Sequence, residues 1–152
     1  MNDASPAPIF EFFNEIGIIS QLSSALFSRT LPDGLHVSHF SILNHMVRLG
    51  DGRTPVQLAS AFQLTKATMT HSLGVLEKAG FVRIEPNPQD GRSKLVHLTA
   101  EGRDFREEAI QCVRLAFQPI LEKLDPEFLR SLTPHLRRVR QALDEARSGA
   151  AD

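Results

Sequence analysis

The strongest constraint on the fold is a pair of helix-start signals that lie close together in the middle of the chain. Thr54-Pro55-Val56-Gln57 has the composition of a capping box with proline at the first helical position. Leu64-Thr65 repeats the signal, with Thr65 as the N-cap and Leu64 placed to pack on Met69. Two short capped helices separated by so few residues must cross at a steep angle. The stretch therefore predicts a helix-turn-helix.

The second of these helices has apolar residues on one face. Met69, Leu73 and Leu76 follow helical spacing, and Gly80 is placed to end the helix. Four short or planar side chains near the N-terminus fall on the opposite side: Ala67, Thr68, Thr70 and His71. Threonine and histidine can hydrogen-bond base edges, and a threonine methyl can contact a thymine methyl.

A β-hairpin is predicted directly after the second helix. Residues 81–85 and residues 94–98 each alternate, so that four apolar side chains can pair on one face: Val82, Ile84, Val96 and Leu98. Residues 86–91 contain two prolines and a glycine, and are predicted to form a loop that no strand enters. Helix, turn, helix and hairpin together indicate a winged helix-turn-helix, a shape suited to the DNA major groove.

The flanking segments are predicted to be helical. A helix from about Pro8 to Arg29 carries apolar residues on more than one side, which burial between two subunits would explain. After a loop at residues 31–34, Ser38 is expected to cap a further helix, with Val37 and Ile42 as a hydrophobic staple.

Two helices are expected after the hairpin. Thr99 caps a long helix, in which Pro119 predicts a kink or break near Gln118. Asp125-Pro126 restarts a helix with a short heptad-like leucine seam, although Pro134 leaves Thr133 open as an alternative start.

The predicted fold class is thus mainly α with a small β-hairpin wing. We expect an N-terminal dimerisation helix and loop at residues 1–36, a winged helix-turn-helix at residues 37–99, and C-terminal dimerisation helices at residues 100–152.

Composition excludes several classes of protein and weakens one argument for DNA binding. The 152 residues are 41% hydrophobic and 23% charged, without a long apolar run or a basic leader, so we expect a cytoplasmic globular protein. The net charge is -1, and residues 51–105 carry seven basic against six acidic side chains. Phosphate binding must therefore depend on where the cations lie rather than on bulk charge.

The order of elements resembles the MarR family of bacterial transcriptional regulators. The wing sequence DGRSKLVHLTAEG, from Asp90 to Gly102, resembles the family's Asp-x-Arg motif followed by a strand that ends Leu-Thr-x-x-Gly. Thr68 and Thr70 also fit the family's reading helix, as do Leu76, Gly80 and Val82. The chain departs from the family at His71, where arginine is frequent, and at Ile84-Glu85, where the family often has two arginines.

Several DNA-binding residues are expected on this basis. The N-terminus of the reading helix, with Thr65 and Lys66, suits a phosphate, and the exposed face from Ala67 to His71 suits base edges. The resemblance implies that Arg92 enters the minor groove from the wing tip. Lys94 and Arg53 are candidate phosphate contacts. Asp90 is expected to orient the tip through Arg92 or a turn amide.

The resemblance implies a homodimeric regulator, most simply a repressor, that binds a pseudo-palindromic operator. A small-molecule effector is implied by the family alone. The alternative is a winged-helix module for protein interaction that has lost DNA binding, which the scarcity of cations motivates. No catalytic constellation is visible, and no cofactor is expected.

Two sensing hypotheses remain open. His36, His39 and His45 gather around one predicted helix, but without the spacing of a metal site, and His97 and His135 lie elsewhere. Cys112 falls on the apolar stripe of a long helix, which predicts a buried thiol rather than a redox sensor.

Overall fold

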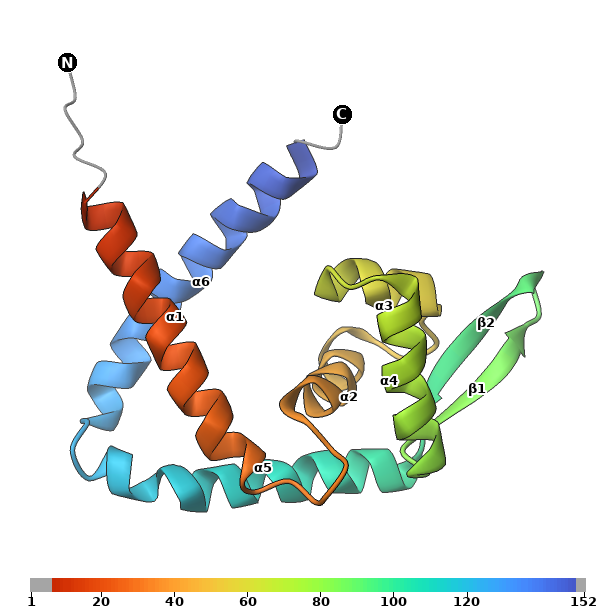
Figure 1. The fold of residues 1–152 in the computed structure, drawn as a ribbon, viewed down its shortest axis with the longest axis horizontal. Coiled ribbons are helices and arrows are strands. Elements are labelled where there is room, and N and C mark those ends of the chain that lie inside the picture. Colours follow the sequence, from red (N-terminus) through yellow and green to blue (C-terminus); the bar gives the residue numbers. More distant parts are fainter. Residues whose placement is uncertain (1–6, 150–152) are drawn as a thin grey trace. The chain divides into compact units, whose positions relative to one another are not determined.

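The computed structural model describes residues 7–149, so the ends of the predicted terminal segments, residues 1–6 and 150–152, lie outside it. Within that range the chain forms six helices and one antiparallel hairpin (Figure 1). The predicted fold class is therefore confirmed. The chain divides into one compact unit that ends at Ala116 and a second that begins at Phe117.

The elements follow one another in a simple order. They are α1 (Ala7–Ser28), α2 (Val37–Leu49), α3 (Pro55–Phe62), α4 (Lys66–Lys78), β1 (Val82–Asn87), β2 (Asp90–Leu98), α5 (Ala100–Leu121) and α6 (Pro126–Gly149). No helix within residues 7–149 combines the length and the apolar character that a membrane span needs.

The two central caps form as the sequence predicts. The Gln57 N–H donates to Thr54 Oγ1 at 3.2 Å, and the Thr54 N–H donates back to Gln57 Oε1 at 2.9 Å. The Thr68 N–H donates to Thr65 Oγ1 at 3.1 Å. Gly80 follows the end of α4 with a φ of 79°, a left-handed conformation that glycine adopts without strain.

Helix α2 begins differently from the prediction. The helix starts at Val37 with His36 as its N-cap, so Ser38 is already helical. The imidazole of His39 lies at the third helical position, where its Nδ1 accepts the His36 N–H at 3.0 Å. A histidine thus performs the role that glutamate or glutamine has in a capping box. Sequence rules for N-caps do not include this residue, and the prediction of Ser38 was wrong.

The core lies between α2, α3, α4 and the base of the hairpin. Its fully buried large side chains are Ile42, Leu43, Met46, Leu58, Met69, Leu73, Leu76 and Val96. All three predicted inward residues of α4 belong to this set. Helix α1 packs on α2, where the rings of Phe27 and Phe40 meet edge to face with centroids 4.7 Å apart.

The hairpin pairs the apolar residues that the sequence predicts, but its strands are longer. Val82 pairs with Leu98 and Ile84 pairs with Val96, as expected. However, β1 continues through Pro86 to Asn87, and β2 already begins at Asp90, so the prediction of a loop at residues 86–91 was too long. A proline is accepted here because β1 has a sheet neighbour on one side only.

The last two helices start where the sequence predicts, and neither ends at its internal proline. Helix α5 contains Pro119 and runs three residues beyond Gln118, to Leu121. Helix α6 starts at Pro126, where Asp125 Oδ1 accepts the Glu127 N–H at 3.0 Å, and it includes Pro134. Thr133 is therefore not the start. Cys112 is exposed rather than buried, because helical spacing predicts a face but not whether a neighbour covers that face.

The start of α5 is pressed against the segment that follows α4. The hydroxyl of Thr99 donates to Gly80 O at 2.6 Å and accepts the Gly102 N–H at 3.0 Å. Gly102 is buried so closely that a Cβ atom there would lie 2.1 Å from Phe81 O. The rings of Phe81 and Phe105 stack with centroids 4.4 Å apart. Only glycine permits this approach of helix to backbone.

Gly102→Ala should therefore lower the free energy of unfolding by about 1–3 kcal/mol, because the added methyl group overpacks against backbone atoms that cannot rotate away. Gly74→Ala is the matched control, since a Cβ at that helical glycine meets nothing within 4 Å. It should stabilise the chain by about 0.5–1 kcal/mol. Urea denaturation measures both, and equal stability of the two variants would contradict this account of Gly102.

Burial should also make stability depend on pH. His39 is 4% exposed, and its pKa lies below the ordinary 6.5 because of burial and, secondarily, the charges of His36 and His71. Burial, followed by Arg53 and Arg48, also lowers the pKa of His45. The unfolded chain then binds more protons than the folded chain below pH 6.5. The free energy of unfolding should therefore fall as pH decreases through that value.

His39→Gln tests this effect, because glutamine keeps an acceptor for the His36 N–H and removes the titrating ring. Denaturant melts between roughly pH 7.5 and pH 5.5 should show a smaller loss of stability than in the unmodified chain. An identical pH dependence in the two chains would refute the assignment to His39.

Candidate nucleic-acid interface

The exposed face of α4 lies opposite the residues that hold it in the core. Met69, Leu73 and Leu76 are fully buried. The predicted reading residues are all exposed: Ala67, Thr68, Thr70 and His71. The burial of one face thus leaves a row of small and planar side chains on the other, free of competing contacts with the core.

The N-terminus of α4 is ordered by two hydroxyl groups. Thr65 Oγ1 and Thr68 Oγ1 lie 2.8 Å apart, within hydrogen-bond distance, and Thr65 also caps the Thr68 N–H. The N–H groups of Lys66 and Ala67 come before the first intrahelical bonds and point out of the helix end. Free N–H groups beside an exposed lysine favour a phosphate oxygen.

A groove of about 550 Å³ joins this helix end to the wing. Its lining includes five of the predicted site residues: Lys66, Thr70, Asp90, Arg92 and Lys94. The start of α3, at Thr54, Pro55 and Val56, forms another part of the wall. The start of α3, helix α4 and strand β2 therefore contribute residues to one concave surface. Three of these residues carry a positive charge: Lys66, Arg92 and Lys94.

The wing tip is held by its own polar groups. Asp90 Oδ1 accepts the backbone N–H of Arg92 at 3.1 Å, so its carboxylate contacts the turn amide rather than the guanidinium. Asn87 Nδ2 donates to Ser93 Oγ at 2.9 Å across the hairpin, and Asn87 Oδ1 accepts the Gln89 N–H. Sequence reasoning did not find Asn87 and Ser93, because their pairing needs the register of the two strands.

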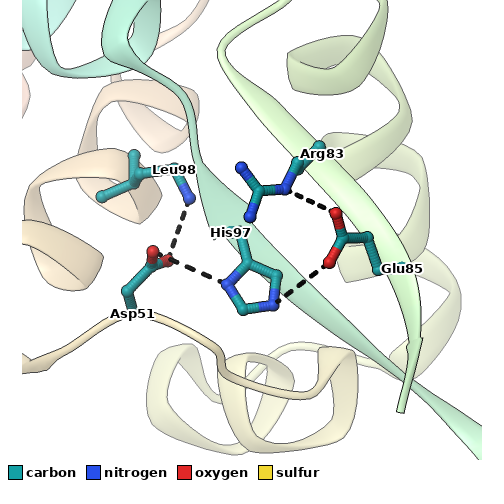
Figure 2. Close-up of polar contacts among 5 residues, drawn as sticks. All are labelled: Asp51, Arg83, Glu85, His97 and Leu98. Atoms are coloured by element: carbon teal, nitrogen blue, oxygen red, sulfur yellow. Dashed lines mark hydrogen bonds and ion pairs between the residues drawn. The ribbon is translucent and has the colours of Figure 1, made fainter. Parts of the chain in front are cut away.

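A chain of polar contacts lies at the base of the wing (Figure 2). Asp51 Oδ1 accepts the Leu98 N–H at 2.9 Å, and its second oxygen lies 3.7 Å from His97 Nδ1. His97 Nε2 is 3.9 Å from Glu85, whose other oxygen accepts from Arg83 Nε at 2.6 Å. These contacts join the loop before α3 to both strands. They also place the acidic Glu85 beside Arg83 and His97.

Arg53 has a structural position as well as a charge. Its backbone forms a bridge to β2, with the Val96 N–H donating to Arg53 O at 2.8 Å. Its guanidinium donates to Leu49 O at the end of α2. Of the predicted phosphate contacts, Arg53 is thus the one already bound to the protein. It does not line the groove.

The cations of the winged helix-turn-helix at residues 37–99, which we call the reader, differ in whether a carboxylate pairs with them. Arg83 is paired with Glu85, whereas Lys66, Arg92 and Lys94 have no carboxylate partner among residues 7–149. These three charges all line the groove, whereas Arg48 and Lys78, which also have no carboxylate partner among residues 7–149, do not line it. Three unpaired cations therefore gather on one surface.

The histidines do not form a metal site in the part of the chain that the structure describes. His36 and His39 stack with ring centroids 5.5 Å apart, but no group of three histidine, cysteine or carboxylate side chains gathers there. The ring of His45 instead packs on Phe62, with centroids 5.2 Å apart.

A family model, related sequences and solved structures all match this chain to transcriptional regulators. The model of the MarR family matches residues 33–93. The transcriptional regulator HosA of Escherichia coli O111:H- is 32% identical over 121 residues, which cover 80% of this chain and 82% of HosA.

Two solved structures of the MarR protein from E. coli are also similar. The apo form of the wild type is 27% identical with a TM-score of 0.70, covering 83% of this chain and 94% of that one. A cysteine-to-serine mutant complexed with operator DNA is 25% identical with a TM-score of 0.70, covering 90% and 99%. Together with the winged helix-turn-helix and the exposed face of α4, these matches show that the chain belongs to the MarR family of DNA-binding transcriptional regulators.

Proposed function

We propose that the protein is a homodimeric repressor that acts in the cytoplasm and binds a pseudo-palindromic operator. The observation that carries this proposal is the groove, which brings Lys66, Arg92 and Lys94 together beside the exposed face of α4. Helix α4 enters the major groove, and each wing reaches the adjacent minor groove. The two reading helices then lie about 34 Å apart, one turn of DNA.

Sequence selectivity comes from the exposed face of α4. Thr68, Thr70 and His71 contact base edges, where threonine and histidine can hydrogen-bond and threonine can also contact a thymine methyl. Phosphates bind Lys66 with the N-terminus of α4, and also Lys94. Arg53 makes a weaker phosphate contact than Lys66 or Lys94, because its guanidinium would first have to give up the hydrogen bond to Leu49 O. Asp90 holds the tip that presents Arg92.

The apolar surface of α1 supports a dimer. Phe10 is 72% exposed and Leu22 is 68% exposed, and no residue of α1 is buried in the described chain. Helix α6 likewise exposes Phe128, Leu132, Leu136 and Leu143. A surface this apolar on long helices is typical of subunit packing. We therefore assign residues 1–36 and 100–152 to dimerisation, and residues 37–99 to DNA binding.

A small-molecule effector is part of the proposal. Such a ligand would release DNA by binding more tightly to a form of the dimer in which the two readers have the wrong spacing. We propose neither a metal nor a cofactor, and no chemistry beyond binding.

Arg92→Ala should weaken binding to DNA from upstream of the protein's own gene. A dimer that loses two contacts to DNA charge should also lose about 1.8 from the slope of log K against log salt, at about 0.9 for each contact. Fluorescence anisotropy at several salt concentrations measures both quantities. Lys123→Ala is the matched control, since Lys123 is exposed between α5 and α6 and lies outside the groove.

The outcome that contradicts the proposal is equal affinity and equal salt slope for Arg92→Ala and Lys123→Ala. If the unmodified chain binds no DNA at low salt, the protein-interaction module becomes the better interpretation.

Phe10→Glu should dissociate the dimer, because it places a charge on the apolar surface of α1 that the proposed interface covers. Light scattering at micromolar concentration should give the mass of two chains for the unmodified protein and of one chain for the variant. Gln21→Glu, which adds the same charge to the same helix at an exposed polar position, should remain dimeric. A monomeric mass for the unmodified protein would refute the dimer.

A further inference from the structure

The reader contacts α5 at the first turn of the helix and again further along it. The first point is the close contact of Gly102 and Phe105 with Phe81, directly after the end of α4. It fixes where α5 starts. A helix held at its first turn alone is fixed at one end only, so a small change of angle there displaces its later turns by a larger distance.

The second point is a polar contact further along the helix. Arg106 donates from Nε at 3.1 Å and from Nη2 at 2.9 Å to one oxygen, Asn44 Oδ1 of α2. Arg106 lies four residues after Gly102, which places it about 6 Å further along the axis. Two donors on one acceptor constrain both the distance and the direction between α5 and α2.

Burial and charge suit this contact to its position. The side chain of Arg106 is 18% exposed, and its remaining end pairs with Glu107, so the guanidinium is not left as an uncompensated charge. Asn44 lies between Leu43 and Met46, two fully buried residues of α2. The acceptor oxygen therefore belongs to a rigid part of the winged domain. Any swing of α5 about Phe81 would break the contact.

We propose that Arg106 and Asn44 are positioning residues that fix the direction in which α5 leaves the winged domain, and thereby set the half-site spacing that the dimer accepts. The inference rests on the proposed function, since it needs two readers joined through their terminal helices. Neither residue touches DNA. Their effect is on the distance between the two readers, not on how each reader binds its half-site.

The experiment compares a set of DNA fragments derived from the site that the protein protects upstream of its own gene. The set keeps both half-sites and inserts or removes base pairs between them, and a further fragment holds one half-site alone. The unmodified chain should bind one spacing much more tightly than the others. Arg106→Ala should lose about tenfold in affinity at that spacing. Its affinity for the neighbouring spacings should come closer to its affinity for the preferred spacing. It should bind the single half-site as tightly as the unmodified chain does.

Four further variants separate positioning from stability. Arg103→Ala removes an exposed arginine from the same helix and should keep the spacing preference. Asn44→Ala should act like Arg106→Ala, and the double variant should lose no more than either single one. Asn44→Asp keeps an acceptor oxygen for the guanidinium and should keep the preference.

Unchanged spacing discrimination in folded Arg106→Ala would overturn this inference. So would an equal loss for every fragment, including the single half-site, because that result indicates a damaged reader. These outcomes differ from failure of the proposed function, in which the unmodified chain binds none of the fragments.

Discussion

The burial of one face of α4 is the interaction on which the rest of the structure depends. Met69, Leu73 and Leu76 are fully enclosed by α2, α3 and the hairpin, so the helix has a single possible orientation. At about 25 cal/mol per Å² of apolar surface, three such side chains contribute several kcal/mol to holding it there. Because that face is fixed inward, the opposite face from Ala67 to His71 is fixed outward. The wing and the start of α3 then form a groove beside it.

The distribution of charge resolves an apparent conflict between composition and function. A chain with a net charge of -1 attracts DNA weakly from a distance. The structure pairs Arg83 with Glu85, engages Arg53 with Leu49 O, and leaves Lys66, Arg92 and Lys94 available on one surface. Counterion release is then limited to the few contacts that these three charges make in each subunit of the proposed dimer, and the proposal assigns selectivity to direct base contacts and to two readers in register. Under that proposal, selectivity depends on the contacts between α5 and the winged domain as well as on the exposed face of α4.

What could be predicted from the sequence was local. The caps at Thr54 and Thr65 depend on residues within one turn, and the pairing of Val82 with Leu98 follows from alternation, so these predictions were confirmed. The prediction of Ser38 as the N-cap of α2 was wrong because the imidazole of His39 takes the place of the usual acceptor and His36 becomes the N-cap. The Asn87–Ser93 pair, the bridge from Arg53 to Val96 and the Arg106–Asn44 contact could not be predicted, because each depends on strand register or on residues far apart in the chain. For the same reason, spacing assigned Cys112 to a face but not to an environment.

The central claim is that two cation-poor readers act together on one DNA site. The most direct test is a titration of the unmodified protein against DNA from upstream of its own gene, with stoichiometry and affinity measured at several salt concentrations. We expect two chains for each site and a slope of log K against log salt near about -5, from three charges in each of two subunits. One chain for each site, or no sequence-selective binding even at low salt, would contradict the account.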